Sequence, residues 1–515
     1  MSQQNDLRID KDIFVSTFAV LLAVCLPLIF FPEQGESVVK QLFNITTKNL
    51  GFVYIWAGLL ALGTAGYLIF SKYGGITLGD QGETPEFRTF SWASMLFCAG
   101  IGAGIMYWGV IEGIYYYNAP PLGYEKGSWQ AAELAATYGI FHWGPVAWAM
   151  YSLPAVPIGY SYFVRKKPVL KISEVCRGVL GDKVDGPLGK AIDVIFLFGI
   201  VGGASTSLGL GTPLAAACVS KVFGIEQSSN LTLALLVLVS IIFTVSSYLG
   251  LKKGIEMLSR LNITVMIGIL LFVLVAGPTL FIIKMSTTSI GVLLKEFVRM
   301  ATWMDPVGNS GFVEGWTVFY WAWWMSYAPF MGLFIARISR GRTIRNMLSG
   351  ALFWGSFGCA VSFFILGNFS LYLQVNEILP VADMLGKIGA PATIVEILSS
   401  LPLGGVVVFL FAVVCVIFMA TTFDSASYTM AAVTTHEIKE GQEPARYNRL
   451  FWAISISLLP TALIIIDGPL STLQTTSIVF ALPVTFVLVT VMVSFFKDMA
   501  AERQERDAVE KRSQA

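Results

Sequence analysis

The sequence has few charged residues for its length. Of its 515 residues 13% are charged, whereas soluble globular domains have about 25%. Hydrophobic residues make up 55% of the chain, and the net charge is +1. A nearly neutral chain lacks the basic surface that binds nucleic acid. The composition therefore argues against a soluble protein and against a nucleic-acid partner, and it indicates a protein whose helices cross a membrane.

The sequence also lacks the motifs of common enzymes. Its six cysteines are scattered and form no CxxC pair, which argues against a disulfide framework or a metal site. No Walker, HExxH or GxSxG sequence is present, and the stretch "GIGAG" does not match the GxGxxG dinucleotide pattern. We therefore expect no enzymatic activity and no cofactor.

Long apolar runs predict an all-α integral membrane protein. The run 13–31 is long enough to cross about 30 Å of hydrocarbon as a helix. It follows a polar segment, 1–12, and carries no small-residue cleavage site, so we interpret it as a retained first span. The sequence predicts twelve spans, at about 13–31, 52–70, 90–116, 134–164, 191–222, 231–249, 263–283, 316–337, 347–373, 404–435, 450–466 and 473–496.

The connections between these spans alternate in basic content. The connections 165–190 and 337–346 are rich in lysine and arginine, whereas 223–230 and 467–472 contain none. The positive-inside rule then places both termini in the cytoplasm, as an even number of spans requires. We expect an amphipathic interfacial helix at about 288–300 and a charged, disordered cytoplasmic tail at 497–515.

Glycines interrupt the third predicted span. Gly100, Gly102 and Gly104 alternate in "AGIGAGIMYWG", and each interior glycine costs a helix about 1 kcal/mol relative to alanine. Small residues also permit close helix contacts, but contact motifs usually repeat every four residues. We therefore expect an unwound segment whose free backbone groups can bind a carboxylate or a cation.

Aromatic residues concentrate in the middle of two spans. The stretch "FHWGPVAWAMY" contains Trp143, Trp148 and Tyr151, and the stretch "YWAWWMSYAPF" contains Trp323, Trp324 and Tyr327 with Tyr320. Packing stripes or interfacial anchors are the alternatives, but aromatic faces also attract quaternary ammonium groups. No acidic residue lies within either stretch, which favours a zwitterion over a bare cation.

Hydroxyl side chains gather in two other spans. Thr421 and Thr422 stand beside Asp424, and Thr206 and Ser207 follow Ser205. Hydroxyl and carbonyl oxygens suit a small hard cation such as sodium, although hydroxyls also hydrogen-bond between helices. We interpret two other buried carboxylates, Glu112 and Asp193, as structural or gating residues, and His142 as a hydrogen-bonded structural group.

Three motifs resemble the betaine/choline/carnitine transporter family. They are "FHWGPVAWAMY", "GWTVFYWAWWMSYAPFMGLFIARISRGRT" and "TTFDSASYTMA", in this order, and the resemblance covers about residues 12–500. It implies a leucine-transporter-like inverted repeat of five plus five helices, preceded by two extra helices. Spans 3–7, about 90–283, and spans 8–12, about 316–496, would be the repeats. It also implies a homotrimer with contacts at the amphipathic helix before span 8.

The resemblance also assigns residues to roles. It implies a substrate cage of Trp143, Trp323, Trp324 and Tyr327 with Trp148, Tyr151 and Tyr115 nearby. The first sodium ion would bind the backbone carbonyls of Cys98, Ala99 and Ile101 and the hydroxyls of Thr421 and Thr422. A second would bind Thr206 and Ser207 with Phe330.

Comparison within the family favours a sodium-coupled carrier of a zwitterion. Sodium-independent carnitine exchangers have an arginine where this chain has Asn262, and choline carriers tend to have an acid at the position of Gly104. Tyr327 stands where betaine carriers usually have tryptophan, which keeps a longer betaine such as carnitine open. We predict sodium symport of a trimethylammonium zwitterion, by alternating access, in a bacterial inner membrane. The alternatives are sodium-independent exchange and transport of choline or another methylated amine.

Overall fold

The protein is helical throughout the part of the chain that the structure describes. The computed structural model describes residues 8–167, 171–249, 252–438, 442–465 and 470–514. Residues 1–7 of the predicted N-terminal tail, residue 466 of the eleventh predicted span and residue 515 therefore lie outside the described residues. Within the described ranges the β-structure is limited to two isolated bridges, Ile9 with Thr435 and Thr77 with Thr343.

The first span is fastened at its N-terminal end. Helix α1 (Lys11–Phe30) is capped by Asp10, whose side chain accepts a hydrogen bond from the Ile13 amide. Burial opposes ionisation of Asp10, but the Lys171 ammonium, 2.7 Å away, lowers the pKa of this carboxyl overall. Helix α2 (Pro32–Asn44), which the sequence did not predict, connects α1 to α3 (Leu50–Phe70) through a π-helical turn, Ile45–Asn49.

The third predicted span is broken where its glycines lie. Helix α4 (Thr89–Ile101) ends at Gly102, which has a φ of +55°, and α5 (Gly104–Asn118) starts two residues later with a bend of 63°. A left-handed φ of this kind is readily adopted only by glycine. The predicted interruption is therefore confirmed.

The fourth predicted span is also interrupted. It is divided into α6 (Trp129–His142), α7 (Pro145–Ser152), α8 (Ala155–Gly159) and a π-helical end, Tyr160–Val164. Pro145 is the first residue of α7, where its missing N–H is not needed. The continuous helix expected over 134–164 is therefore wrong, and the aromatic residues of this span lie on both sides of a break.

The rest of the first half is regular. Two short helices, α9 (Ile172–Val175) and α10 (Arg177–Leu180), precede the long helix α11 (Pro187–Phe223), which is followed by α12 (Ser229–Leu249) and α13 (Lys252–Ala276). Helix α14 (Thr279–Thr302) contains the predicted amphipathic segment but begins nine residues earlier than expected. The seventh span accordingly ends at Ala276 rather than 283.

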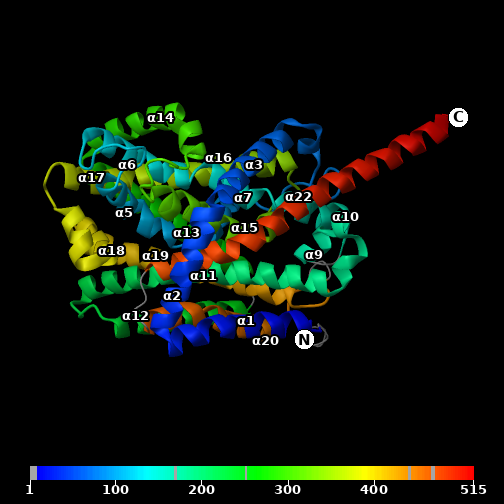
Figure 1. Ribbon diagram of the computed structural model, residues 1–515, viewed down its shortest axis with the longest axis horizontal. Helices are drawn as coiled ribbons and strands as arrows, with labels where there is room; N and C mark the ends of the chain where they lie inside the picture. The colour runs from blue at the N-terminus through cyan, green and yellow to red at the C-terminus, as the bar shows by residue number, and fades with distance from the viewer. Residues whose placement is uncertain (1–7, 168–170, 250–251, 439–441, 466–469, 515) are drawn as a thin grey trace.

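The second half differs from expectation at three places. Its helices are α15 (Phe319–Ile338), α16 (Ile344–Ser362), α17 (Asn368–Val375), α18 (Val381–Ser399), α19 (Gly404–Val433), α20 (Arg446–Ile456), α21 (Leu458–Ile465) and α22 (Leu470–Gln514). Helix α18 was not predicted, and the eleventh span is divided between α20 and α21. The tail expected to be disordered instead continues α22, which projects beyond the helical bundle (Figure 1).

Fewer helices than the twelve predicted spans are long and apolar enough to cross a membrane. Among the described residues eight helices are long and apolar enough to cross a bilayer, or nine if α4 and α5 form one span. The other three predicted spans coincide with the interrupted α6–α8, the tryptophan-rich α15 and the divided α20–α21. The total of twelve remains a prediction, as does the inverted repeat.

The long helices α11 and α19 pack against each other in the middle of the molecule, and α15 and α22 pack against α11 (Figure 1). Helix α15 also contacts α7, which brings the two aromatic stretches together.

Candidate functional site

The aromatic residues predicted to form a cage meet in one buried cluster. Trp143, at the end of α6, lies with its ring centroid 4.9 Å from that of Trp324 and 5.9 Å from that of Trp323, both on α15. The interplanar angles are 74° and 85°, so the Trp143 ring stands nearly perpendicular to the two indoles. On the other side, Tyr151 of α7 contacts Trp324 at 5.4 Å and Tyr327 at 6.3 Å. Trp324 therefore has the Trp143 ring on one side and the Tyr151 ring on the other.

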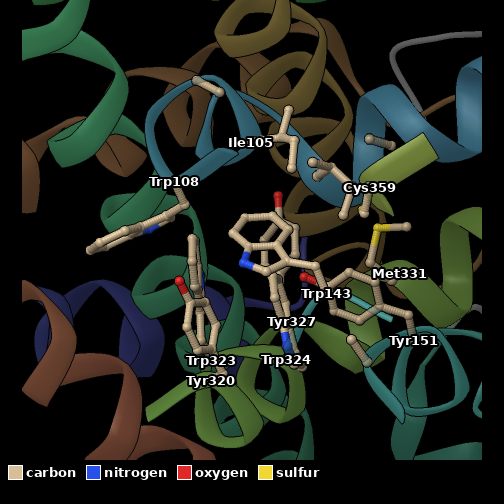
Figure 2. Close-up of a cluster of buried hydrophobic side chains, with 14 of the residues drawn as sticks. Ile105, Trp108, Trp143, Tyr151, Tyr320, Trp323, Trp324, Tyr327, Met331 and Cys359 are labelled. Atoms are coloured by element: carbon tan, nitrogen blue, oxygen red, sulfur yellow. The ribbon is translucent and has the colours of Figure 1, made fainter. Parts of the chain in front are cut away.

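These rings are closed off from solvent. Trp143, Trp323, Trp324, Tyr327, Tyr151 and Trp148 each expose 2% or less of their surface. In Figure 2 Trp143 lies at the centre, with Tyr320 and Trp323 to one side and Tyr151 and Met331 to the other. The aromatic cluster is therefore closed to solvent in this structure.

The broken span lies directly against the aromatic cluster. A Cβ atom at Gly104 would come within 3.0 Å of the Trp143 ring and 3.2 Å of the Trp323 ring. One at Gly100 would come within 3.1 Å of the Trp148 ring, whose centroid is 5.9 Å from that of Tyr151. Two of the predicted glycines therefore let the backbone approach the aromatic rings closely, and Gly102 supplies the break between them.

A buried carboxylate, which the sequence interpretation gave a structural or gating role, lies behind the aromatic cluster. Glu112 of α5 is fully buried and accepts hydrogen bonds from the Trp143 indole at 3.0 Å and from the hydroxyls of Tyr116 and Tyr320. Three donors on two oxygens suit an ionised carboxylate. No acid lies within either aromatic stretch, but α5 brings the Glu112 carboxylate to the assembled cluster. The absence of an acid from the two stretches is therefore no evidence for a zwitterion.

His142 extends this network, as its predicted structural role requires. Its Nδ1 lies 2.8 Å from the Tyr116 oxygen, and its Nε2 lies 3.1 Å from the Thr317 hydroxyl. Because Tyr116 donates its only proton to Glu112, its oxygen accepts from Nδ1–H, which leaves Nε2 as the acceptor of the Thr317 proton. This network fixes the orientation of the Trp143 and Tyr320 side chains.

Tyr115 belongs to a neighbouring aromatic group. Its ring contacts Trp108 at 6.0 Å and Trp316 at 5.4 Å, and Trp108 contacts Tyr320 at 6.3 Å. The structure therefore joins Tyr115 to the central rings through Trp108 and Tyr320 rather than placing it among them.

Two polar groups of the central cluster make no hydrogen bond in the structure. They are the Tyr327 hydroxyl and the Trp148 indole nitrogen, both fully buried. A buried donor without an acceptor costs about 1–3 kcal/mol. An acceptor brought in by a ligand would remove that cost.

The predicted first ion site is partly assembled. The Thr422 hydroxyl of α19 lies 3.1 Å from the Cys98 carbonyl, at the end of α4. Ala99 and Ile101 lie in the last turn of α4, where helix geometry leaves carbonyl oxygens without helical partners. The Thr421 hydroxyl instead bonds the carbonyls of Ile417 and Phe418 in its own helix.

The predicted second ion site has a different composition. The Thr206 hydroxyl lies 2.8 Å from the Ser477 hydroxyl of α22, and both lie 3.1 Å from the Gly202 carbonyl. Ser207 is buried one residue further along α11, and the Phe330 ring contacts Tyr327 at 4.6 Å. Ser477 was not predicted, because nothing in the polar stretch "QTTS" that it ends indicates a partner on α11.

Comparison with known proteins supplies the family. The family described as "BCCT, betaine/carnitine/choline family transporter" matches residues 12–504. A protein of Escherichia coli (strain K12) named "Uncharacterized transporter YeaV" is 35% identical over 439 residues, which cover 85% of this chain and 91% of that protein. A protein of Acinetobacter baumannii named "Carnitine transporter" is 34% identical over 491 residues, covering 95% of this chain and 88% of that one.

Among solved structures, a Na+-coupled sialic acid symporter in a substrate-bound, outward-open state is similar over 88% of this chain and 87% of its own. The sequence identity is 13% and the TM-score 0.46, a level that does not establish a shared fold. The family match, in contrast, spans nearly the whole chain and is supported by relatives of similar length. This multi-pass membrane protein therefore belongs to the betaine/carnitine/choline transporter family, a family of bacterial transporters for quaternary ammonium compounds.

Proposed function

We propose that this protein takes up a trimethylammonium zwitterion, such as glycine betaine or carnitine, by sodium symport. The observation that carries this proposal is the convergence of Trp143 from α6 with Trp323 and Trp324 from α15. A desolvated cation gains about 2 kcal/mol or more from an aromatic face. Quaternary ammonium groups suit such a site because they have no N–H that would need an acceptor.

The polar groups around the rings support a substrate that carries one positive and one negative charge. The carboxylate of Glu112 lies behind Trp143, where it favours the ammonium end. The unpartnered donors of Tyr327 and Trp148 favour a carboxylate on the substrate, which would accept from them. The A. baumannii relative named for carnitine supports a longer betaine as one substrate of this class.

The transport cycle that we propose is alternating access. Substrate and sodium would bind between the two halves of the molecule and favour each other's binding, since such linkage couples their movements. The broken span α4–α5 would serve both ligands. It touches the aromatic rings at Gly104 and presents the Cys98 carbonyl to Thr422.

The topology and assembly complete the proposal. We place twelve spans in the inner membrane of a bacterium, both termini in the cytoplasm, and the two repeats as inverted copies. The protein would form a homotrimer surrounded by membrane lipid, with α14 at the subunit contacts.

Removing a ring tests the aromatic site. In Trp324→Ala we expect the substrate affinity to fall about 30-fold, because about 2 kcal/mol of cation–π interaction is lost. Binding of labelled carnitine and glycine betaine to purified protein would measure this. Trp56→Ala is the matched control, since Trp56 is 61% exposed, and it should bind as the unmodified protein does. Unchanged binding by Trp324→Ala would refute the aromatic site.

A second experiment tests sodium coupling. Uptake into proteoliposomes should be several-fold faster with an inward sodium gradient than with an equal potassium gradient. Equal rates, together with a requirement for substrate inside the vesicles, would instead establish the sodium-independent exchanger. Choline and trimethylamine as competitors would measure how much the substrate carboxylate contributes.

A further inference from the structure

The imidazole of His142 is enclosed within the network behind the aromatic cluster. It is completely buried, and its ring stacks on that of Tyr320 with the centroids 4.8 Å apart. Its Nδ1 lies 2.8 Å from the Tyr116 oxygen and 3.7 Å from the Glu112 carboxylate. Histidine is the side chain whose charge ordinarily changes between about pH 5 and pH 8. The carboxylate of the aromatic site therefore lies next to a group that can carry a positive charge.

The other ionisable side chains around His142 come from five helices. Each is a phenol, a thiol or a member of an ion pair: Tyr116 of α5, Tyr138 of α6, Tyr320 of α15, Cys359 of α16 near Glu112, and Glu296 and Arg299 of α14 near Tyr138, which pair with each other at 3.7 Å. Phenols and thiols are largely neutral near pH 7. Among these described neighbours Glu112 therefore supplies the unbalanced charge that His142 faces.

A proton on His142 would change the charge behind Trp143. The neutral ring donates from Nδ1 to Tyr116 and accepts at Nε2 from the Thr317 hydroxyl, 3.1 Å away. After protonation Nε2–H donates to the Thr317 oxygen instead, and the imidazolium forms an ion pair with the Glu112 carboxylate. Because this pair has no net charge, the negative charge that favours a cation in front of Trp143 is cancelled.

We propose that His142 makes a proton and a quaternary ammonium ion compete for the aromatic site. The inference rests on the proposed function, because the ammonium group must lie in front of Trp143. His142 acts through Glu112 and Trp143 and does not touch the substrate, so it is a positioning residue. Since linkage is reciprocal, a bound cation favours the neutral imidazole, and its binding releases a proton from the imidazolium. Acid therefore weakens substrate binding.

The first test is the pH dependence of binding. The dissociation constants of choline and carnitine are measured with purified protein from about pH 8 to about pH 5.5, a range over which neither compound changes its charge. In the unmodified protein the constant for choline should rise about tenfold toward the acid end, as it would on removal of the Glu112 charge, and that for carnitine by a smaller factor. His142→Asn keeps a donor for Tyr116 but cannot be protonated, so both of its constants should stay unchanged with pH.

His436→Gln is the matched control. His436 is the other of the two histidines of the chain, and its side chain is 58% exposed and lies beside Asp10, outside the aromatic cluster. This variant should keep the pH dependence of the unmodified protein.

A second measurement detects the proton directly. Calorimetric titration with carnitine near pH 6.5, the ordinary pKa of histidine, in two buffers of different ionisation enthalpy gives the number of protons released per substrate bound. The unmodified protein and His436→Gln should release a fraction of one proton, and His142→Asn none. Should His142→Asn not fold, His142→Gln replaces it. Should neither fold, His436→Gln decides, because His142 is then the single histidine of the chain, and a lack of proton release would overturn the proposal.

The outcomes separate this inference from the proposed function. Binding that is independent of pH and releases no proton in the unmodified protein would refute the role of His142, while the proposed function stands. Tighter binding in acid, or a pH dependence that persists in His142→Asn, would also overturn it, because the sign or the titrating group would be different. If the unmodified protein bound neither compound at any pH, the proposed function and this inference would fail together.

Discussion

At the scale of single residues, the position of Glu112 determines how the aromatic site works. Its two oxygens accept from residues that lie 4, 31 and 208 positions away, on three different helices. The carboxylate therefore fixes the orientation of Trp143 and Tyr320 and also places a negative charge behind their rings. Both effects favour a cation in front of the rings.

Glu112→Gln should weaken the binding of cationic substrates. The change keeps the size of the side chain but removes its charge and turns one acceptor into a donor. Because a hydrogen bond to a charged group contributes about 1.5–3 kcal/mol, we expect the dissociation constant to rise about tenfold or more. Choline should lose more affinity than carnitine, since a zwitterion also gains from donors elsewhere in the site. Binding of the two compounds to purified variants measures the difference.

Asp193→Asn provides the control for that experiment. Asp193 of α11 is an equally buried carboxylate, but it accepts from the amide and hydroxyl of Ser173, outside the aromatic cluster. Its loss should lower the temperature of unfolding without altering either dissociation constant. If Glu112→Gln behaved in the same way, Glu112 would be a purely structural residue.

The sequence predicted which aromatic residues matter better than it predicted their polar partners. Trp143, Trp323, Trp324 and Tyr327 stood out because aromatic clusters in the middle of a span are unusual. Glu112 stood out as a carboxylate within a predicted span, but nothing near it in the sequence indicates its aromatic partners. Gly203, whose carbonyl lies 3.4 Å from the Trp323 nitrogen, carries no local signal. Their roles follow from the packing of α5 and α11 against α15, which a single sequence does not reveal.

At the scale of elements, the C-terminal end of the fourth predicted span is fastened to the last helix. Arg165, directly after the π-helical end of α8, lies 2.6 Å from Asp498 and 3.3 Å from Glu502, both on α22. The Tyr160 hydroxyl donates to Glu502 as well. These contacts join a helix of the first half to one of the second, so any movement of the halves apart at this side must break them.

Arg165→Glu should therefore favour opening at this side. Isolated surface ion pairs contribute only about 0–1 kcal/mol, so we expect a two- to fivefold rise in the substrate concentration for half-maximal uptake. The double variant Arg165→Glu with Asp498→Arg recreates an opposite pair and should partly restore the original value. Uptake of substrate added outside the vesicles gives the half-maximal concentration for the single and the double variant. Failure of the double variant to recover any affinity would count against a role for this contact.

Elements could be predicted where hydrophobic runs were continuous and could not where charge or proline intervened. The runs of α11, α12 and α19 agree with their predicted ranges within a few residues. Helix α18 was missed because its sequence contains charged residues and two helix breakers, Gly389 and Pro391. The charge of residues 497–515 predicts disorder, whereas the structure continues α22 to Gln514, because alternating charges along a helix can also form a stable solvated face.

At the scale of the whole molecule, one apolar surface lies open on α14. It is formed by Leu280, Ile283, Ile290, Leu294 and Val298, each between 49% and 78% exposed. Their spacing of three, seven, four and four residues places them within one narrow face of the helix. From Leu280 to Val298, a separation of 18 residues, the face extends for about 27 Å, at 1.5 Å per residue. A face of this length can be covered by lipid or by another copy of the chain, and the predicted trimer favours the second.

Leu294→Lys should convert the proposed trimer to monomers without removing the aromatic site. A lysine in the middle of an apolar contact between copies would bury an unpaired charge, which costs several kcal/mol. Light scattering of the detergent-solubilised protein should give three times the mass of one chain for the unmodified protein and a single chain for the variant. Leu60→Lys on α3 is the control, because Leu60 is exposed as well, at 61%. This variant should remain a trimer. Substrate binding by the monomeric variant should persist, since Trp143, Trp323 and Trp324 come together within one chain. A variant that remained trimeric would mean that α14 faces lipid and that the subunits meet elsewhere.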